Sequence, residues 1–366
     1  MCDIAGYIGP REAAPILLEM LRREEKWDGW GSTGMALVTE AGLRVERVPG
    51  PTEEFERAFD LSGLKGHAGI IHSRPASSEP HESQTPLNRH KRLLRAHPFV
   101  DADIRLALVT NGTGRDNSKH PLVKAAAEAE NVRLSLQGIP QKLAEDPLEL
   151  ERFSAGSGLR ALRIGDMVRR GRTPAQALAE SYEGPFIREN VGVMVHADTP
   201  DRLYVLRVTR PMVAAVCRDE CYIATTRFAF PEDIEPLSVV DLPLGEVVEV
   251  YAGRLVYTGI RLAEIPEEVT PALQAEALDR VTAYLREHAD RSFYFDELED
   301  YLYRNCRDIW QRPLVESAYV LENSCLKPYA QLLYDSLYTL DRAGQLVYDE
   351  RETSVGRRYF VTLKEN

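Results

Sequence analysis

Five short apolar segments follow one another between residues 191 and 251, and turn residues separate them. They cover residues 191–195, 202–208, 212–216, 221–225 and 246–251. Apolar segments of this length, bounded by turns, are typical of β-strands. Further strands are predicted at 2–8, 69–72 and 106–109, with a hairpin over 35–48. Apolar residues at helical spacing in 10–23, 122–130 and 158–170 add helices, so residues 2–260 predict a layered α+β domain.

A segment rich in proline and glutamate at 261–274 predicts a linker, and the pattern changes beyond it. Amphipathic helices are predicted at 275–290, 295–304 and 326–343, followed by a hairpin of strands 346–348 and 359–361. Helices followed by a two-stranded wing resemble a winged-helix domain, here at 275–366. A generic α+β cap or dimerisation module fits the same pattern.

Charge and composition exclude several classes of partner. The net charge of -12 argues against a nucleic-acid or anionic-membrane binder, because both select a basic surface. Acidic residues also outnumber basic ones in 275–366, so we expect this region to contact a protein partner or a second copy of the chain. The chain has neither a long apolar run nor a signal-peptide pattern, which predicts a cytoplasmic location. Its five scattered cysteines fit reduced thiols, and we expect no metal site and no cofactor.

Cys2 is the first candidate for chemistry. A thiol is a good nucleophile only as thiolate and needs a nearby base. If an aminopeptidase removes Met1, the free α-amine of Cys2 has an ordinary pKa of about 7.7–8.0 and can act as that base. A Met-Cys start can also be incidental, so the interpretation depends on the motifs that follow.

Short motifs follow Cys2 in a fixed order along the chain. They are MCDIAGYIG at 1–9, WDGWGSTGMAL at 27–37, GIIHSRPAS at 69–77, AHPF at 96–99, VTNG at 109–112, TRPM at 209–212 and YIATT at 222–226. Together they resemble the class II glutamine amidotransferases, which are N-terminal-nucleophile hydrolases. The resemblance implies a four-layer αββα sandwich, in which two antiparallel sheets lie between helices.

The resemblance also implies roles for individual residues. Cys2 would be the nucleophile and its own amine the base. The side-chain amide of Asn111 and the backbone N–H of Gly112 would form the oxyanion hole. Arg74 would bind the α-carboxylate of glutamine through its guanidinium, with His72 and Ser77 also in the substrate-binding group.

Four departures from the family pattern bear on the substrate. Asp3 replaces the glycine that follows the nucleophile, where a carboxylate beside the thiol would disfavour the thiolate and add bulk in place of backbone. Pro75 stands where the family has Trp, and Ser78 stands where many members have His. The acid that binds the α-ammonium of glutamine has no counterpart near Gly156. An insertion at 80–95, rich in histidine and basic residues, occupies the loop that covers glutamine in the family, where it predicts a lid or partner contact, or a solvated loop.

Three interpretations therefore stay open. The first is a glutaminase-type amidotransferase that forms a thioester on Cys2 and releases ammonia for a separate acceptor subunit, because residues 275–366 are too short for an acceptor domain. The second is a catalytically degenerate regulatory or binding protein on the same fold, favoured by Asp3 and by the missing acid. The third is a hydrolase with the same nucleophile acting on a different amide.

Overall fold

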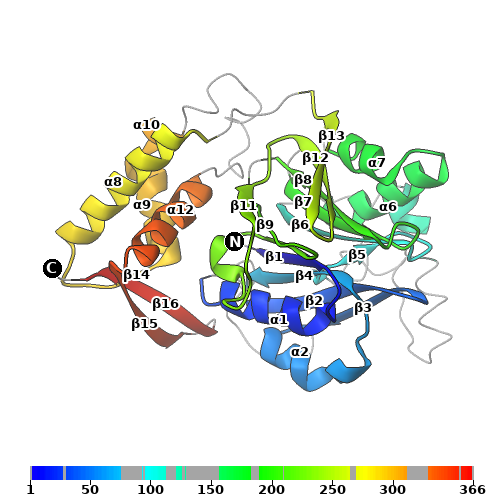
Figure 1. Cartoon of the computed structure of the whole chain (residues 1–366), viewed down its shortest axis with the longest axis horizontal. Coiled ribbons are helices and arrows are strands. Elements are labelled where there is room, and N and C mark those ends of the chain that lie inside the picture. Colours follow the sequence, from blue (N-terminus) through cyan, green and yellow to red (C-terminus); the bar gives the residue numbers. More distant parts are fainter. Residues whose placement is uncertain are drawn as a thin grey trace.

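The protein is described by a computed structural model, which covers most of the 366 residues. The described residues are 2–27, 30–75, 93, 95–112, 121–125, 128, 156–182, 189–208, 210–263, 269–310, 329–353 and 356–364. Two parts are distinguished below. The sandwich domain comprises the described residues up to 263, and the C-terminal module comprises those from 269 onward (Figure 1).

The first sheet of the sandwich domain has seven described strands in the order β11-β9-β10-β1-β4-β2-β3. Neighbouring strands run antiparallel. The strands are β1 Asp3–Ile8, β2 Trp30–Thr39, β3 Gly42–Val48, β4 Ala68–Pro75, β9 Val213–Val216, β10 Cys221–Ala224 and β11 Ser238–Asp241. The N-terminal strand β1 therefore lies in the middle of the sheet, between β10 and β4, which fixes the residue before it against both neighbours.

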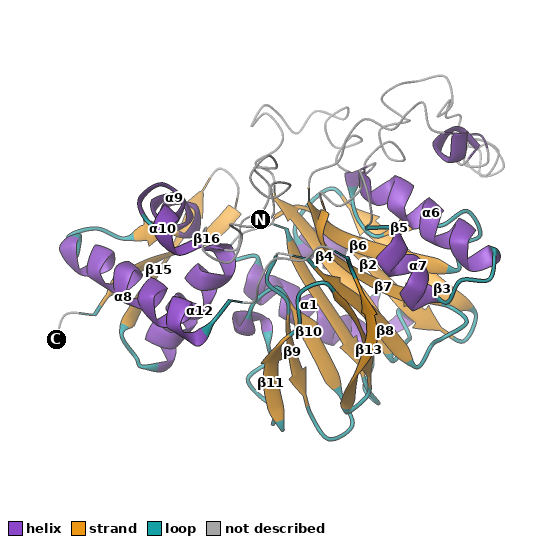
Figure 2. Cartoon of the chain, turned by 90° about the horizontal axis from the view of Figure 1, so that it is seen from above, coloured by secondary structure: helices purple, strands orange, loops and turns teal. Residues whose placement is uncertain are grey.

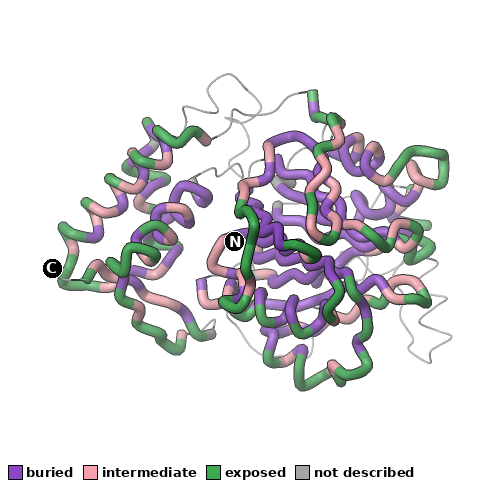
Figure 3. The backbone as a smooth tube through the Cα atoms, in the orientation of Figure 1, coloured by how far each residue is buried: buried purple, intermediate pink, exposed green. Residues whose placement is uncertain are grey.

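The second sheet has six described strands in the order β13-β12-β8-β7-β6-β5, also antiparallel. They are β5 Phe99–Val100, β6 Leu106–Gly112, β7 Glu189–His196, β8 Arg202–Arg207, β12 Glu246–Tyr251 and β13 Arg254–Arg261. Alternate residues of the two sheets, such as Ile4, Ile70, Val109 and Val193, meet in one buried apolar core. The sheets therefore pack face to face, and Figure 3 shows that the backbone of their strands is largely buried.

Helices cover the outer face of each sheet. On the first sheet, α1 Ala13–Glu24 and α2 Thr52–Ala58 pack in a core that contains Tyr7, Leu17 and Phe55. On the second sheet, α6 Gly156–Arg169 and α7 Pro174–Glu180 pack in a core that contains Leu108 and Leu178. Short 3-10 turns η1 Leu61–Gly63 and η4 Arg227–Ala229 complete the described domain. The layers are helix, sheet, sheet, helix, and Figures 1 and 2 show this stacking.

The C-terminal module has a core of its own. Its elements are α8 Pro271–Glu287, β14 Phe293–Tyr294, α9 Phe295–Asn305, α10 Arg307–Trp310, α12 Tyr329–Arg342, β15 Leu346–Thr353 and β16 Gly356–Leu363. The three strands form one sheet in the order β14-β16-β15, and apolar side chains of α8, α9 and α12 pack together beside it. One member of that core, Trp27, comes from the sandwich domain.

The mixed arrangement of helices and sheets predicted from the sequence is confirmed. Four described strands, β5, β11, β13 and β14, were not predicted. In β13 the exposed and partly buried residues alternate without a strongly apolar face, because it is the edge strand of its sheet. The helix predicted from residue 275 begins earlier, at Pro271, because proline fits the first turn and the side chain of Thr270 caps it. Within the described helices, none is long and apolar enough to cross a membrane.

Candidate active site

Cys2 and Asn111 meet where the two sheets face each other. Cys2 immediately precedes β1, and Asn111 lies near the end of β6 in the other sheet. The Asn111 side-chain amide donates a hydrogen bond from Nδ2 to the carbonyl oxygen of Cys2 at 3.1 Å. Asn111 is buried, and the register of β6 on β7 shifts between Asn111 and Gly112. The fold therefore brings Cys2 together with Asn111 and Gly112, which are far from it in sequence, where the two strands end.

The thiol of Cys2 is half-buried among positive charges. Burial raises the pKa of this thiol, while the α-amino terminus, Arg74 and Arg210 lower it and Asp3 raises it. Arg74 belongs to β4, the direct neighbour of β1. The cations favour the thiolate, but desolvation is the larger influence, so the net pKa direction is upward.

A pair of buried histidines lies behind this site. His72 of β4 stacks on His97 with ring centroids 4.0 Å apart. The Nε2 atom of His72 lies 3.1 Å from the carbonyl oxygen of Thr110, the residue before Asn111. Burial and, to a smaller extent, the charge of Arg74 lower the pKa of His72 to about 3, so the ring is neutral near pH 7. His72 is fully buried, and its described polar contact is with strand β6; its predicted contact with substrate stays a prediction.

Asp3 lies on the opposite face of the first sheet from this inter-sheet site. It pairs with Ser73 of β4, which pairs in turn with Thr33 of β2, so the three side chains share one face. Ile4, one residue on, belongs to the core between the sheets. From its place after the nucleophile, the Asp3 carboxylate was expected to lie beside the thiol and to add bulk there. Strand alternation instead directs it toward the end of α1, although its charge still acts on Cys2.

Two glutamates that the sequence analysis missed surround Asp3. Glu24 and Glu25, at the end of α1, are buried. Glu25 accepts hydrogen bonds from Thr52 Oγ1 at 2.7 Å and Ser73 Oγ at 3.0 Å, and Glu24 accepts one from the backbone N–H of Thr226 at 3.0 Å. Burial, together with the charge of Glu25, raises the pKa of Asp3 to about 7. These residues come from separate segments, so their spacing along the chain carried no signal.

Several other predicted features lie outside the described residues. They are Ser77 and Ser78, nearly all of the insertion at 80–95, and the acids upstream of Gly156, namely Asp146, Glu149 and Glu151. Gly156, the position aligned with the family's acid, is the first residue of α6. Among the described residues, no group of His, Cys, Asp and Glu is arranged to hold a metal ion.

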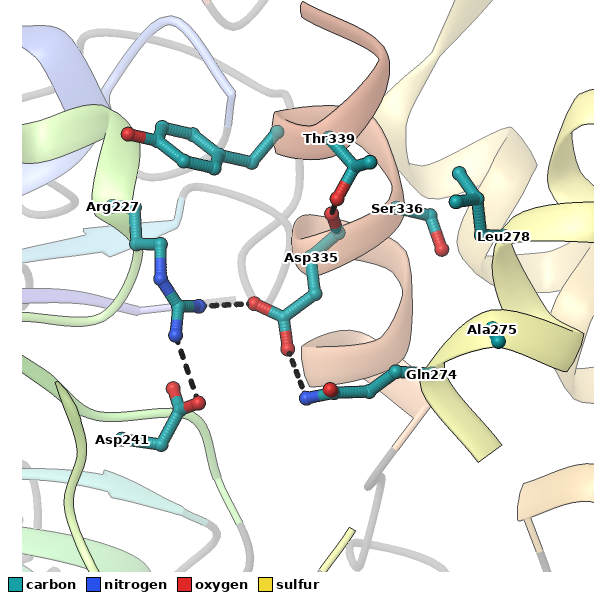
Figure 4. A pocket seen from close by; sticks show the side chains of 9 residues that line it. Arg227, Asp241, Gln274, Ala275, Leu278, Asp335, Ser336 and Thr339 are labelled. Carbon is teal, nitrogen blue, oxygen red and sulfur yellow. Dashed lines mark hydrogen bonds and ion pairs between the residues drawn. The ribbon is translucent and has the colours of Figure 1, made fainter. Parts of the chain in front are cut away.

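A pocket of about 260 Å³ lies at the junction between the sandwich domain and the C-terminal module (Figure 4). Arg227 of η4 points between two carboxylates, pairing with Asp241 at 2.8 Å and with Asp335 of α12. The Gln274 side chain of α8 donates to the other oxygen of Asp335 at 3.1 Å. The polar groups that line the pocket therefore bind one another across the junction, and these contacts link the two parts of the chain.

Two curated relatives of this chain share one enzyme name. No family model matches the chain. It is 33% identical over 183 residues to a glutamine–fructose-6-phosphate aminotransferase of Thermus thermophilus, covering 50% of this chain and 28% of the relative. It is 30% identical over 266 residues to the enzyme of the same name from Thermosynechococcus vestitus, covering 72% and 36%. The chain thus spans about a third of the length of these curated relatives.

Among solved structures, the glutamine phosphoribosylpyrophosphate amidotransferase of B. subtilis is similar over 80% of this chain and 59% of its own. The sequence identity in this match is 16% and the TM-score is 0.48.

Proposed function

We propose that this chain, a divergent relative of the class II glutamine amidotransferases, hydrolyses the side-chain amide of glutamine with the Cys2 thiol as nucleophile. The family resemblance predicted from the sequence is confirmed by the glutamine–fructose-6-phosphate aminotransferases among its relatives. The observation that carries the proposed chemistry is the hydrogen bond from Asn111 Nδ2 to the Cys2 carbonyl oxygen, which keeps an amide donor beside the residue that would attack.

The reaction is proposed in two steps. Sγ of Cys2 bonds to the amide carbon, and the thiol proton passes through the Cys2 amine, free after removal of Met1, to the leaving nitrogen. Ammonia departs and a γ-glutamyl thioester remains. Water then adds to the thioester carbon, glutamate leaves, and the proton returns to sulfur. Asn111 Nδ2 and the Gly112 N–H would stabilise the oxyanion in both steps, and one such donor typically contributes about 2.7–4 kcal/mol.

The binding roles and the use of the ammonia belong to the same proposal. Arg74 has a position on β4 and an influence on the Cys2 thiol that support its predicted role at the glutamine α-carboxylate. Ser77 keeps its predicted role in substrate binding. The ammonia would serve an acceptor on a separate subunit. The cytoplasmic location expected from the sequence stays a prediction.

The C-terminal module is proposed to be a winged-helix-like unit that contacts protein. The three helices α8, α9 and α12 beside the sheet β14-β16-β15, with β15 and β16 as a hairpin, support this interpretation. The acidic excess of the segment favours a protein partner or a second copy of this chain over nucleic acid.

The test is ammonia release from glutamine by the purified full chain, after intact-mass spectrometry has established that Met1 is absent. The Cys2→Ala variant is expected to abolish the release. Cys217→Ala is the matched control, because Cys217 lies in the turn between β9 and β10 and is buried. Ammonia release that is equal in the parent protein and in Cys2→Ala, alone or with candidate partners, would contradict the proposal.

One observation favours the alternative of a catalytically silent binding protein. The pKa of the Cys2 thiol is raised by burial, and the Asp3 carboxylate adds to the rise. On this alternative, Met1 is retained and a glutamine-analogue electrophile does not label Cys2. A mass that lacks Met1, together with labelling of Cys2, would exclude it.

A further inference from the structure

The C-terminal module packs against the segment that follows α1 and bonds to its main chain. Trp27 of that segment is 2% exposed and lies in the module's core, stacked on Phe228 at 4.4 Å between ring centroids and edge-on to Tyr348 and Tyr359. The backbone N–H of Tyr359 in β16 donates to the carbonyl oxygen of Lys26 at 2.8 Å. The module therefore fixes both a side chain and the main chain of the residues next to Glu25.

Arg358 of β16 makes a further buried contact with this segment. Its side chain is almost fully buried. Nη1 donates to the carbonyl oxygen of Glu25 at 2.8 Å, and Nε donates to the hydroxyl of Tyr294 at 3.1 Å. A buried guanidinium needs several acceptors or a negative charge. Its position at the end of α1 brings a positive charge from the module toward the carboxyl groups beneath β1.

Those carboxyl groups are Asp3, Glu24 and Glu25, called here the carboxyl cluster. Hydrogen bonds to Glu25 come from Thr52 and Ser73, but within the described residues neither oxygen of Asp3 has a hydrogen-bond partner. The charges that act on Asp3 are the α-amino terminus and Arg358, which favour the carboxylate, and Glu25, which disfavours it. Asp3 also acts on Glu24 and on two tyrosines of the module, Tyr294 and Tyr334.

Asp3 is the residue next to the nucleophile, and its charge acts on the thiol. A cation that is buried on one side of Asp3 can therefore influence Cys2 in two ways. It holds the main chain at the end of α1, against which β1 packs, and it sets how readily the neighbouring carboxyl ionises.

We propose that Arg358, contributed by the C-terminal module, is a positioning residue of the Cys2 site and acts through the main chain of Glu25 and the side chain of Asp3. The inference rests on the proposed function, because it takes Cys2 as the nucleophile. It makes the module an integral part of the amidohydrolase site, because the module supplies this cation to the carboxyls beneath the nucleophile.

The experiment measures the rate of Cys2 carbamidomethylation by iodoacetamide as a function of pH in the full chain, with peptide mass spectrometry to count Cys2 apart from the other cysteines. The parent profile is expected to show the thiol ionisation and a second inflection near the Asp3 pKa of about 7. In Arg358→Met this second inflection is expected to move upward by about one unit, because Asp3 loses a cation that favours its charged form. Arg358→Lys, which keeps the charge, is expected to restore the parent profile.

The Asp3→Asn variant makes the test specific. It is expected to abolish the second inflection, and in the Asp3→Asn background Arg358→Met is expected to shift no inflection, so that only an effect on the rate through the main chain of Glu25 remains. Arg357→Met is the matched control, since Arg357 is the exposed neighbour on β16 and its ion pairs with Glu350 and Glu352 lie at the surface. Its profile is expected to match that of the parent.

Two results would overturn the proposal: an unchanged profile in Arg358→Met, or a shift that persists undiminished in the Asp3→Asn background. If Arg358→Met does not fold, Tyr294→Phe removes one acceptor of Arg358 and is expected to produce a smaller upward shift, and an unchanged profile there counts against the proposal. Because alkylation involves no glutamine, a chain that releases no ammonia but shows the Arg358 shift refutes the proposed function and leaves the linkage between Arg358 and Cys2 standing.

Discussion

Replacement of Trp27 by alanine is expected to loosen the C-terminal module from the sandwich domain. Burying a large aromatic side chain removes roughly 150–250 Å² from water, which at about 25 cal/mol/Å² corresponds to an upper limit of about 4–6 kcal/mol. Trp27 is 2% exposed and contacts three aromatic rings, so nearly all of this area is involved. Large-to-small replacements of buried tryptophan cost about 3–5 kcal/mol, and we expect a loss in that range.

The assay is urea denaturation followed by far-ultraviolet circular dichroism, combined with limited proteolysis of the native protein. Trp27→Ala is expected to lower the midpoint and to speed cleavage between the two parts of the chain. Trp27→Phe retains an aromatic ring and is expected to lose less. Tyr257→Ala is the surface control, because Tyr257 is 54% exposed on the edge strand β13 and its change is expected to stay within about 0.5 kcal/mol. A loss below about 1 kcal/mol in Trp27→Ala, with unchanged proteolysis, would refute the assignment of the junction's stability to this packing.

Three further predictions concern the site itself. Asn111→Ala is expected to lower kcat for ammonia release by about 10²–10³-fold, measured at saturating glutamine, because one oxyanion donor is lost. An unchanged kcat would show that Asn111 is not part of the oxyanion hole. The folded pKa of His72, about 3, lies below the ordinary value of 6.5, so the stability it contributes is present above pH 6.5 and is lost as the pH falls toward 3. His72→Gln is therefore expected to reduce the pH dependence of the free energy of unfolding over this window by up to about 1.4 kcal/mol per pH unit, and an unchanged slope would contradict it. Gly34→Ala is expected to lower the melting temperature, because an added Cβ would lie 1.9 Å from the carbonyl oxygen of His97; an unchanged melting temperature would show that the backbone yields.

The strands and helices of the sandwich domain were largely predictable. The apolar segments at 2–8, 69–72 and 106–109 correspond to β1, β4 and β6, and the helix predicted at 158–170 corresponds to α6. These predictions succeed because each element buries one face or one whole strand in a core, which leaves a periodic record along the chain. Edge strand β13 left no such record, since it packs only in part.

The order of the motifs was also sufficient to predict the resemblance to the glutamine amidotransferases and to name Cys2, Asn111 and Gly112 as candidates. It could not predict how Asp3 lies. Asp3 was expected to crowd the thiol, and the register of β1 on β4 directs its side chain to the other face of the sheet. Which face a strand residue occupies depends on which strands flank it, and that is decided by the tertiary fold.

The amino-acid sequence by itself determined the layered α+β class, the resemblance to an amidotransferase and the residues that follow its motifs, because all three depend on local pattern and order. Only the tertiary structure decided the surroundings of those residues. Glu24 and Glu25 come from the end of α1, and Arg358 comes from a hairpin far along the chain, yet they gather beneath the residue next to Cys2. A buried charge depends on which side chains reach it through space, and separation along the chain holds no information about that.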